Sequence, residues 1–62
     1  MSEVSEFHSK YKGYYIYKVT QDSGRVTYDI FSYSHANMFT ALEVGVERLA
    51  VAKAIISSEV SQ

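Results

Sequence analysis

The chain has 62 residues, no cysteine and a formal net charge of −1 at pH 7. A chain of this length makes one domain with a small core, so its stability depends on how completely its apolar faces are covered. The lack of cysteine excludes disulfides and thiolate chemistry, and the near-neutral charge argues against a domain that holds polyanions through excess positive charge.

The N-terminal segment is polar apart from Val4 and Phe7. We expect residues 1–6 to be flexible and a single domain to span residues 7–60. The segment lacks the basic-then-apolar order of a signal peptide, and no apolar run approaches the roughly 18 residues that a membrane span requires. These features predict a cytoplasmic protein that does not enter a membrane.

Two stretches rich in aromatic and β-branched residues, 10–20 and 25–34, flank a turn sequence that ends in Gly24. They predict an antiparallel β-hairpin. A two- or four-residue connection would pair Val19 with a position near Val26. A three-residue loop with Gly24 in a bulge would slip the register by one and exchange the residues of the two faces. We favour the first register because it puts Val19, Val26 and Ile30 together on the face expected to cover the helix. Tyr15, Tyr17 and Tyr28 would share that face.

On the favoured register, the outer face of the hairpin is not polar. It carries Lys12, Tyr14, Ile16, Lys18, Thr27, Asp29, Phe31 and Tyr33. An antiparallel sheet with one solvated face normally alternates apolar and polar residues, so this face predicts a partner. We expect Tyr14, Phe31 and Tyr33 to anchor that partner, with Lys12 and Lys18 as a cationic rim.

Residues 40–60 predict a single long helix, which begins with a Thr-x-x-Glu capping box at Thr40. The stripe expected to face the core consists of Leu42, Val46, Leu49, Ile56 and Val60. Val44, Val51 and Ile55 fall on nearly the opposite side of this helix, where a monomer should show charged residues. We therefore expect these three residues to form a dimer interface.

Together these elements predict an α+β fold, a two-stranded antiparallel β-hairpin followed by one long C-terminal α-helix (ββα). Residues 35–39 are too few for a convincing third strand. Because an isolated two-stranded sheet is marginal in water, we expect dimerisation to complete the fold. Two hairpins could pair edge to edge into four strands, or two helices could pack through the Val44 surface.

The opening YKGY at residues 11–14 is followed by a short strand, a glycine turn, a second strand and an alanine-rich helix. This layout resembles small uncharacterised strand–strand–helix domains of bacteria and their phages. The resemblance covers residues 11–58 in layout and the four-residue opening in identity. Many members have a third strand before the helix, which we do not expect here. The resemblance implies a fold and no particular activity.

Residues that could support catalysis are few and poorly spaced. His8 and His35 are the two histidines, without a spacing typical of metal ligands. Glu43 and Glu47 lie one turn apart on the expected helix, where an ordinary solvated face explains them. The three glycines are not placed for a phosphate loop. We expect no enzymatic activity, no cofactor and no metal.

Two functions fit this pattern. The first is a homodimeric protein-interaction module that acts as a regulator or inhibitor by binding another, unidentified protein; a phage or mobile-element origin would suit it by analogy. Six tyrosines in 62 residues favour it, since tyrosine gives contact area at low entropic cost, although β-propensity explains part of this number. The alternative is single-stranded nucleic-acid binding, with the hairpin aromatics stacking on bases. Its phosphate contacts would be Lys10, Lys12, Lys18 and Arg25.

Overall fold

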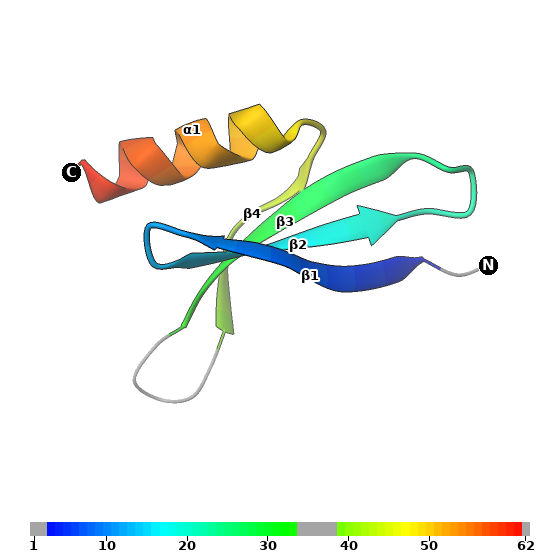
Figure 1. The fold of residues 1–62 in the computed structure, drawn as a ribbon, viewed down its shortest axis with the longest axis horizontal. Coiled ribbons are helices and arrows are strands. Elements are labelled where there is room, and N and C mark those ends of the chain that lie inside the picture. Colours follow the sequence, from blue (N-terminus) through cyan, green and yellow to red (C-terminus); the bar gives the residue numbers. More distant parts are fainter. Residues whose placement is uncertain (1–2, 34–38, 62) are drawn as a thin grey trace.

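The computed structural model describes residues 3–33 and 39–61. It contains β1 (Val4–Tyr11), β2 (Tyr14–Thr20), β3 (Val26–Tyr33), β4 (Phe39–Val46) and α1 (Leu49–Val60). The strands form one antiparallel sheet in the order β1-β2-β3-β4. The helix α1 lies across one face of this sheet (Figure 1). Among the described residues, no helix has both the length and the apolar character needed to cross a bilayer.

The predicted ββα fold is wrong in its number of strands. The fold is α+β, but the central hairpin β2–β3 is flanked on both sides by a further strand. On one side, residues Val4 to Glu6, which we expected to be flexible, belong to β1 and pair with β2. On the other side, β4 uses the first part of the predicted helix. Residues 1, 2 and 34–38 lie outside the described residues.

The segment of β4 forms a strand because pairing with β3 outweighs its local helix signals. Four strands relieve the weakness of an isolated hairpin, and tertiary context commonly overrides intrinsic propensity. Gly45 has φ +71°, a left-handed conformation that does not continue a helix. The capping box predicted at Thr40 is therefore absent. The helix begins only at Leu49, after an extended Arg48 whose side chain makes no capping hydrogen bond.

The favoured register of the hairpin is also wrong, and the three-residue loop is the one that forms. The Gln21 N–H donates to the Arg25 carbonyl oxygen at 2.9 Å, which closes the loop. Gly24 has φ +90° within it. As a result Ile16 pairs directly with Ile30, so the even-numbered residues of β2 and β3 share one face.

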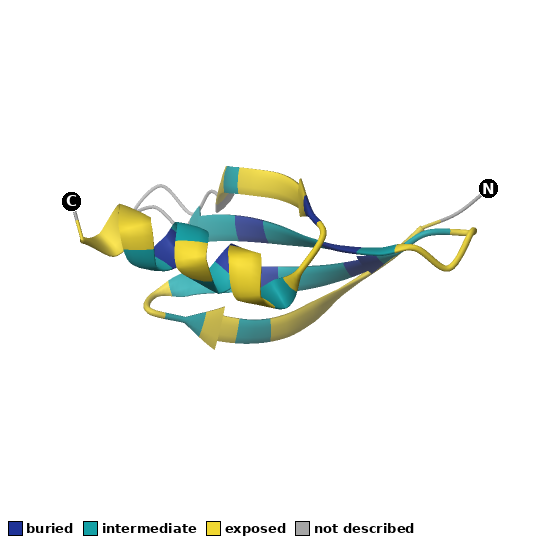
Figure 2. Cartoon of the chain, turned by 90° about the horizontal axis from the view of Figure 1, so that it is seen from above, coloured by how far each residue is buried: buried dark blue, intermediate teal, exposed yellow. Residues whose placement is uncertain are grey.

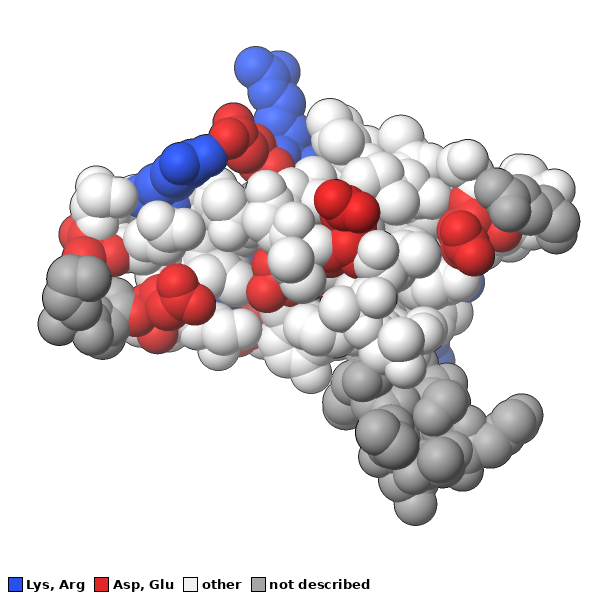
Figure 3. Space-filling view, turned by 180° about the vertical axis from the view of Figure 1, so that it is seen from behind, with Lys and Arg blue, Asp and Glu red and all other residues white. Residues whose placement is uncertain are grey.

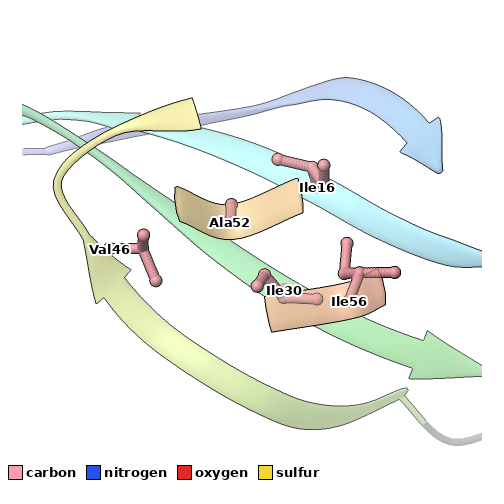
Figure 4. Close-up of a cluster of buried hydrophobic side chains, with 5 residues drawn as sticks. All are labelled: Ile16, Ile30, Val46, Ala52 and Ile56. Carbon is pink, nitrogen blue, oxygen red and sulfur yellow. The ribbon is translucent and has the colours of Figure 1, made fainter. Parts of the chain in front are cut away.

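The core lies between this even-numbered face and α1. Its buried members are Ile16, Ile30, Val46, Ala52 and Ile56 (Figure 4). Partly buried residues packed around them are Tyr11, Tyr14, Tyr28, Leu42, Leu49 and Ile55. Figure 2 shows buried segments of the central strands beneath the helix and others beyond its start. Val19 and Thr27, which pair across β2 and β3 at odd-numbered positions, are also buried, with 5% exposure each. Of the predicted core stripe, Val46 contributes from β4 rather than from the helix, and Val60 is 50% exposed at the end of α1.

Candidate functional site

Figure 1 shows α1 on one face of the sheet and no described element over the opposite face. That opposite face carries a cluster of aromatic rings. The Tyr17 ring lies at its centre, with ring centroids 5.8 Å from Phe7 and 5.5 Å from Phe31, both in edge-to-face geometry. The Tyr15 ring lies 6.3 Å from that of Phe7. We call these four residues the open-face cluster.

The strand register explains how the open-face cluster is assembled. Phe7 pairs with Tyr17 across β1 and β2, and Tyr15 pairs with Phe31 across β2 and β3. Directly opposite residues of two paired strands project from the same face of a sheet. Ile16 and Ile30 face the helix, so the odd-numbered residues of β2 and β3 face the opposite way. Phe7, on the outer strand, is 54% exposed. The rings thus form an apolar surface that spans three strands.

Charge on the open face is sparse and balanced. The Lys10 ammonium lies 5.3 Å from the centroid of the Tyr15 ring, a cation–π arrangement. Asp29 pairs with Tyr17 and therefore shares this face, where one carboxylate oxygen accepts a hydrogen bond from the Gly45 N–H at 3.0 Å. A surface of this kind is suited to an apolar partner and not to a polyanion.

The predicted partner-binding set does not form one surface. Tyr14 packs against the core on the helix side, whereas Phe31 belongs to the open-face cluster. Lys12 lies in the β1–β2 turn and Lys18 lies on the helix side, opposite Tyr28. Tyr33 pairs through its backbone with the first residue of β4, and its side chain lies outside the description.

Sequence reasoning missed Phe7, Tyr15, Tyr17 and Lys10 as members of one site. The slipped register was the signal that could have found them, because it moves the odd-numbered tyrosines of β2 onto the face of Phe31. Phe7 could not be assigned, since residues 1–6 were expected to be flexible and β1 was not predicted.

The predicted dimer interface is likewise divided between two elements. Val44 lies on β4 and is 56% exposed, whereas Val51 lies on α1 and is 46% exposed. Ile55 is half-buried and packs against the core. These three residues do not lie on one helix, so they do not form the predicted helical stripe. Their contact with a second chain stays a prediction.

Both sheet edges carry irregularities that hinder edge-to-edge pairing. The β1–β2 register shifts between Phe7 and Ser9, and the β3–β4 register shifts on both sides of Ile30. Such bulges interrupt the regular ladder that an added strand would need. The exposed Glu43 and Glu47 add negative charge beside β4, and acidic groups are spread over that side of the molecule in Figure 3. The open face is the better candidate for association.

The possible catalytic and metal-binding residues are not brought together. No group of three or more metal-ligating side chains gathers within residues 3–33 and 39–61. The His8 ring bonds to the neighbouring Ser9 hydroxyl at 2.9 Å and packs edge-on against Tyr28. Glu43 lies on β4, while Glu47 follows the strand and forms an ion pair with Arg25. The helical carboxylate pair considered from the sequence therefore does not form, and His35 lies outside the description.

A second polar cluster joins the β1–β2 turn to α1. The Lys12 ammonium donates to the Ser57 hydroxyl at 3.2 Å, and the Tyr11 and Ser57 hydroxyl oxygens lie 3.5 Å apart. The Lys53 ammonium lies 5.3 Å from the centroid of the Tyr11 ring. The hydrogen bond with Ser57 lowers the pKa of the Tyr11 phenol below 10.0, and both ammonium groups act in the same direction against the effect of burial.

Comparison of the chain with family models, with curated proteins and with solved structures finds no significant match. The resemblance to small strand–strand–helix domains is therefore neither supported nor refuted.

Proposed function

We propose that this chain is a non-enzymatic protein-interaction module that binds protein through the open-face cluster. The observation that carries the proposal is a set of contacting aromatic rings on a sheet face that no described element covers. Antiparallel sheets that face water usually present polar residues there, and aromatic side chains are enriched where proteins meet. Regulation or inhibition of a bound protein is the role that suits such a module.

The charges favour a protein partner over single-stranded nucleic acid. Binding to nucleic acid draws much of its free energy from Lys and Arg side chains that neutralise phosphates. On the open face Lys10 is accompanied by the carboxylate of Asp29. Lys12 and Lys18 lie elsewhere, and Arg25 pairs with Glu47. Stacking platforms are present, but the cations needed beside them are not.

The distribution of charge on the open face favours a second copy of this chain as the binding partner. Two-fold symmetric association brings the same patch of two copies together, so a patch that carries opposite charges can complement itself. Lys10 lies on β1 and Asp29 on β3, at opposite sides of the cluster, which allows the lysine of one copy to approach the carboxylate of the other. A covered open face would also add burial to a domain whose own core is small.

Sedimentation equilibrium across the micromolar range tests this proposal with Tyr17→Ala. Truncating an aromatic anchor in the middle of an interface commonly costs roughly 2 kcal/mol or more, which is about 30-fold in affinity. We expect wild-type protein to show the mass of two chains and Tyr17→Ala to show that of one, with an unchanged circular dichroism spectrum. Val51→Ala, on the exposed side of α1, tests the interface predicted from the sequence and should remain dimeric if the open face is the contact.

A wild-type mass of one chain at every concentration, or a dimer that survives Tyr17→Ala, would contradict the second copy as occupant. Titration with a single-stranded oligonucleotide at two salt concentrations addresses the alternative function. Tight binding that weakens steeply with salt would favour nucleic acid over protein.

A further inference from the structure

The β1–β2 turn lies beside the C-terminal half of α1, on the side of the sheet away from the open-face cluster (Figure 1). The turn consists of Lys12 and Gly13, which join Tyr11 at the end of β1 to Tyr14 at the start of β2. The side chain of Lys12 reaches Ser57 on the helix. This hydrogen bond brings together Lys12 and Ser57, which are 45 positions apart in the chain.

Lys12 has an unusual backbone conformation for its residue type. Its φ is +49° and that of Gly13 is +87°, so both central residues of this two-residue turn are left-handed. Turns of this type strongly prefer Asn, Asp or Gly at the first central position, because other side chains are strained there. Lysine is not favoured by the geometry of this turn, so we look for a function of its side chain that offsets the backbone strain.

The side chain of Lys12 contributes one of two positive charges directed at the same ring. Its ammonium lies 5.4 Å from the centroid of the Tyr11 ring, and that of Lys53 lies 5.3 Å from the same centroid. The described contacts of these ammonium groups are to the aromatic ring and the Ser57 hydroxyl, neither of which carries a full negative charge. The lowered pKa of Tyr11, caused first by Ser57 and further by both lysines, fits a local excess of positive potential.

We propose that Tyr11, Lys12, Lys53 and Ser57 form a binding site for a phosphate group, the turn–helix site. Two ammonium groups match the dianionic charge of a phosphate monoester, and the two hydroxyls add donors for its remaining oxygens. The ligand is either inorganic phosphate or a phosphate monoester on a small molecule. This inference is independent of the proposed function, since the open-face cluster lies on the other face of the sheet.

Amide NMR titration of the whole chain with inorganic phosphate tests the site, with sodium chloride holding the ionic strength constant. We expect saturable shifts at the amides of Lys12, Gly13, Lys53 and Ser57. Lys12→Asn should weaken binding by roughly tenfold or more, because it removes a charged donor while asparagine suits the left-handed turn. Arg48→Asn removes the same charge at the exposed start of α1, away from both proposed sites, and should change the affinity by less than about twofold.

A second titration with phosphoserine distinguishes the two sources of the ligand. Tighter binding of phosphoserine than of inorganic phosphate assigns the site to a monoester, and the reverse order assigns it to the free ion. The absence of saturable shifts with both ligands, equal affinity in Lys12→Asn, or an equal loss in Arg48→Asn would each overturn the proposal.

Thermal unfolding separates binding from a purely structural role of the turn lysine. We expect Lys12→Asn to melt at the same temperature as the wild type or higher, because the substitution relieves the left-handed strain. A lower melting temperature would mean that folding contacts with Ser57 and Tyr11 hold the lysine in place. That result would remove the argument from strain and overturn the proposal.

Discussion

Tyr14 and Tyr17 are both half-buried, but they lie on opposite faces of the sheet. Tyr14 packs against the buried cluster beneath α1, where it adds to the free energy of folding. Tyr17 faces the other way and contacts the rings of Phe7 and Phe31. Ring pairs of this kind contribute about 0.5–1.5 kcal/mol beyond their buried area, so the cluster is partly ordered before any partner binds.

Tyr11 gives a titration that can be measured directly. Its pKa lies below 10.0, first because of the hydrogen bond with Ser57 and then because of Lys12 and Lys53. A difference titration of tyrosinate absorbance between wild type and Tyr11→Phe should therefore show a midpoint below pH 10.0. Lys12→Asn should raise this midpoint, since one positive charge is removed.

The lowered pKa of Tyr11 also makes the stability of the fold depend on pH. Because the pKa is lower in the folded state, the unfolded state binds more protons between the folded and unfolded pKa values. The contribution of Tyr11 to stability is thus present above the unfolded pKa and is lost as the pH falls through the folded pKa. A midpoint that is not lower than that of an ordinary tyrosine would contradict the lowered pKa of Tyr11.

Among the secondary-structure elements, β4 depends on the left-handed backbone of Gly45. A continuous helix through this segment would not require glycine there. Gly45 has φ +71°, and a Cβ built on it meets no heavy atom within 4 Å. Substitution by alanine is therefore strained by backbone conformation and not by crowding. The same alanine would favour a continuous helix if that were the native state of this segment.

Gly45→Ala should lower the free energy of unfolding by about 1–2 kcal/mol, the cost of a left-handed L-residue. Urea denaturation measures the change. The matched control is D-alanine at position 45, introduced by chemical synthesis, which adds the same methyl group with the opposite backbone preference and should restore stability. If the L-alanine variant were more stable than the wild type, the segment would be helical and the assignment of β4 would fail.

The sequence predicted the central hairpin and the second half of the helix, because composition and periodicity act locally there. It did not predict β1, since the segment around Val4 is polar and gains its order from pairing with β2. It did not predict β4, since the capping box at Thr40 is a local signal that strand pairing overrides. The register depended on whether Gly24 sits in a three-residue loop, which composition leaves open.

The wrong hairpin register also led to the wrong set of residues for the candidate site. A shift of one residue moved Tyr15 and Tyr17 from the face expected to meet the helix to the face opposite it. Of the predicted anchors, Phe31 remained on an uncovered face and Tyr14 did not. Predicting the composition of a surface thus requires the register to be known first.

The whole molecule is asymmetric, because α1 lies on one face of the sheet (Figure 2) and the open-face cluster lies on the other. The buried cluster beneath α1 is aliphatic, whereas the rings of Tyr15, Tyr17 and Phe31 lie on the face that we propose for association. Oligomers that bury such a face gain stability by mass action, so the melting temperature should rise with protein concentration. The bulged edges leave the open face as the surface for this contact.

Charge reversal at Lys10 tests the arrangement of the two copies. In the proposed dimer Lys10 approaches Asp29 of the other copy, so Lys10→Glu should replace attraction by repulsion. We expect the dimer to weaken by roughly tenfold, so that about ten times more protein is needed to reach the same melting temperature. Arg48→Glu makes the same change in net charge at the start of α1, where Arg48 makes no capping hydrogen bond.

Because both variants carry the same total charge, general repulsion between copies is equal in the two. Arg48→Glu should therefore dimerise as the wild type does, and sedimentation equilibrium compares the three proteins directly. Equal weakening by both variants would mean that net charge, and not the position of Lys10, governs association. A dimer that tolerates Lys10→Glu unchanged would place the contact away from the β1 side of the open face, on the exposed parts of β4 and α1 that include Val44 and Val51.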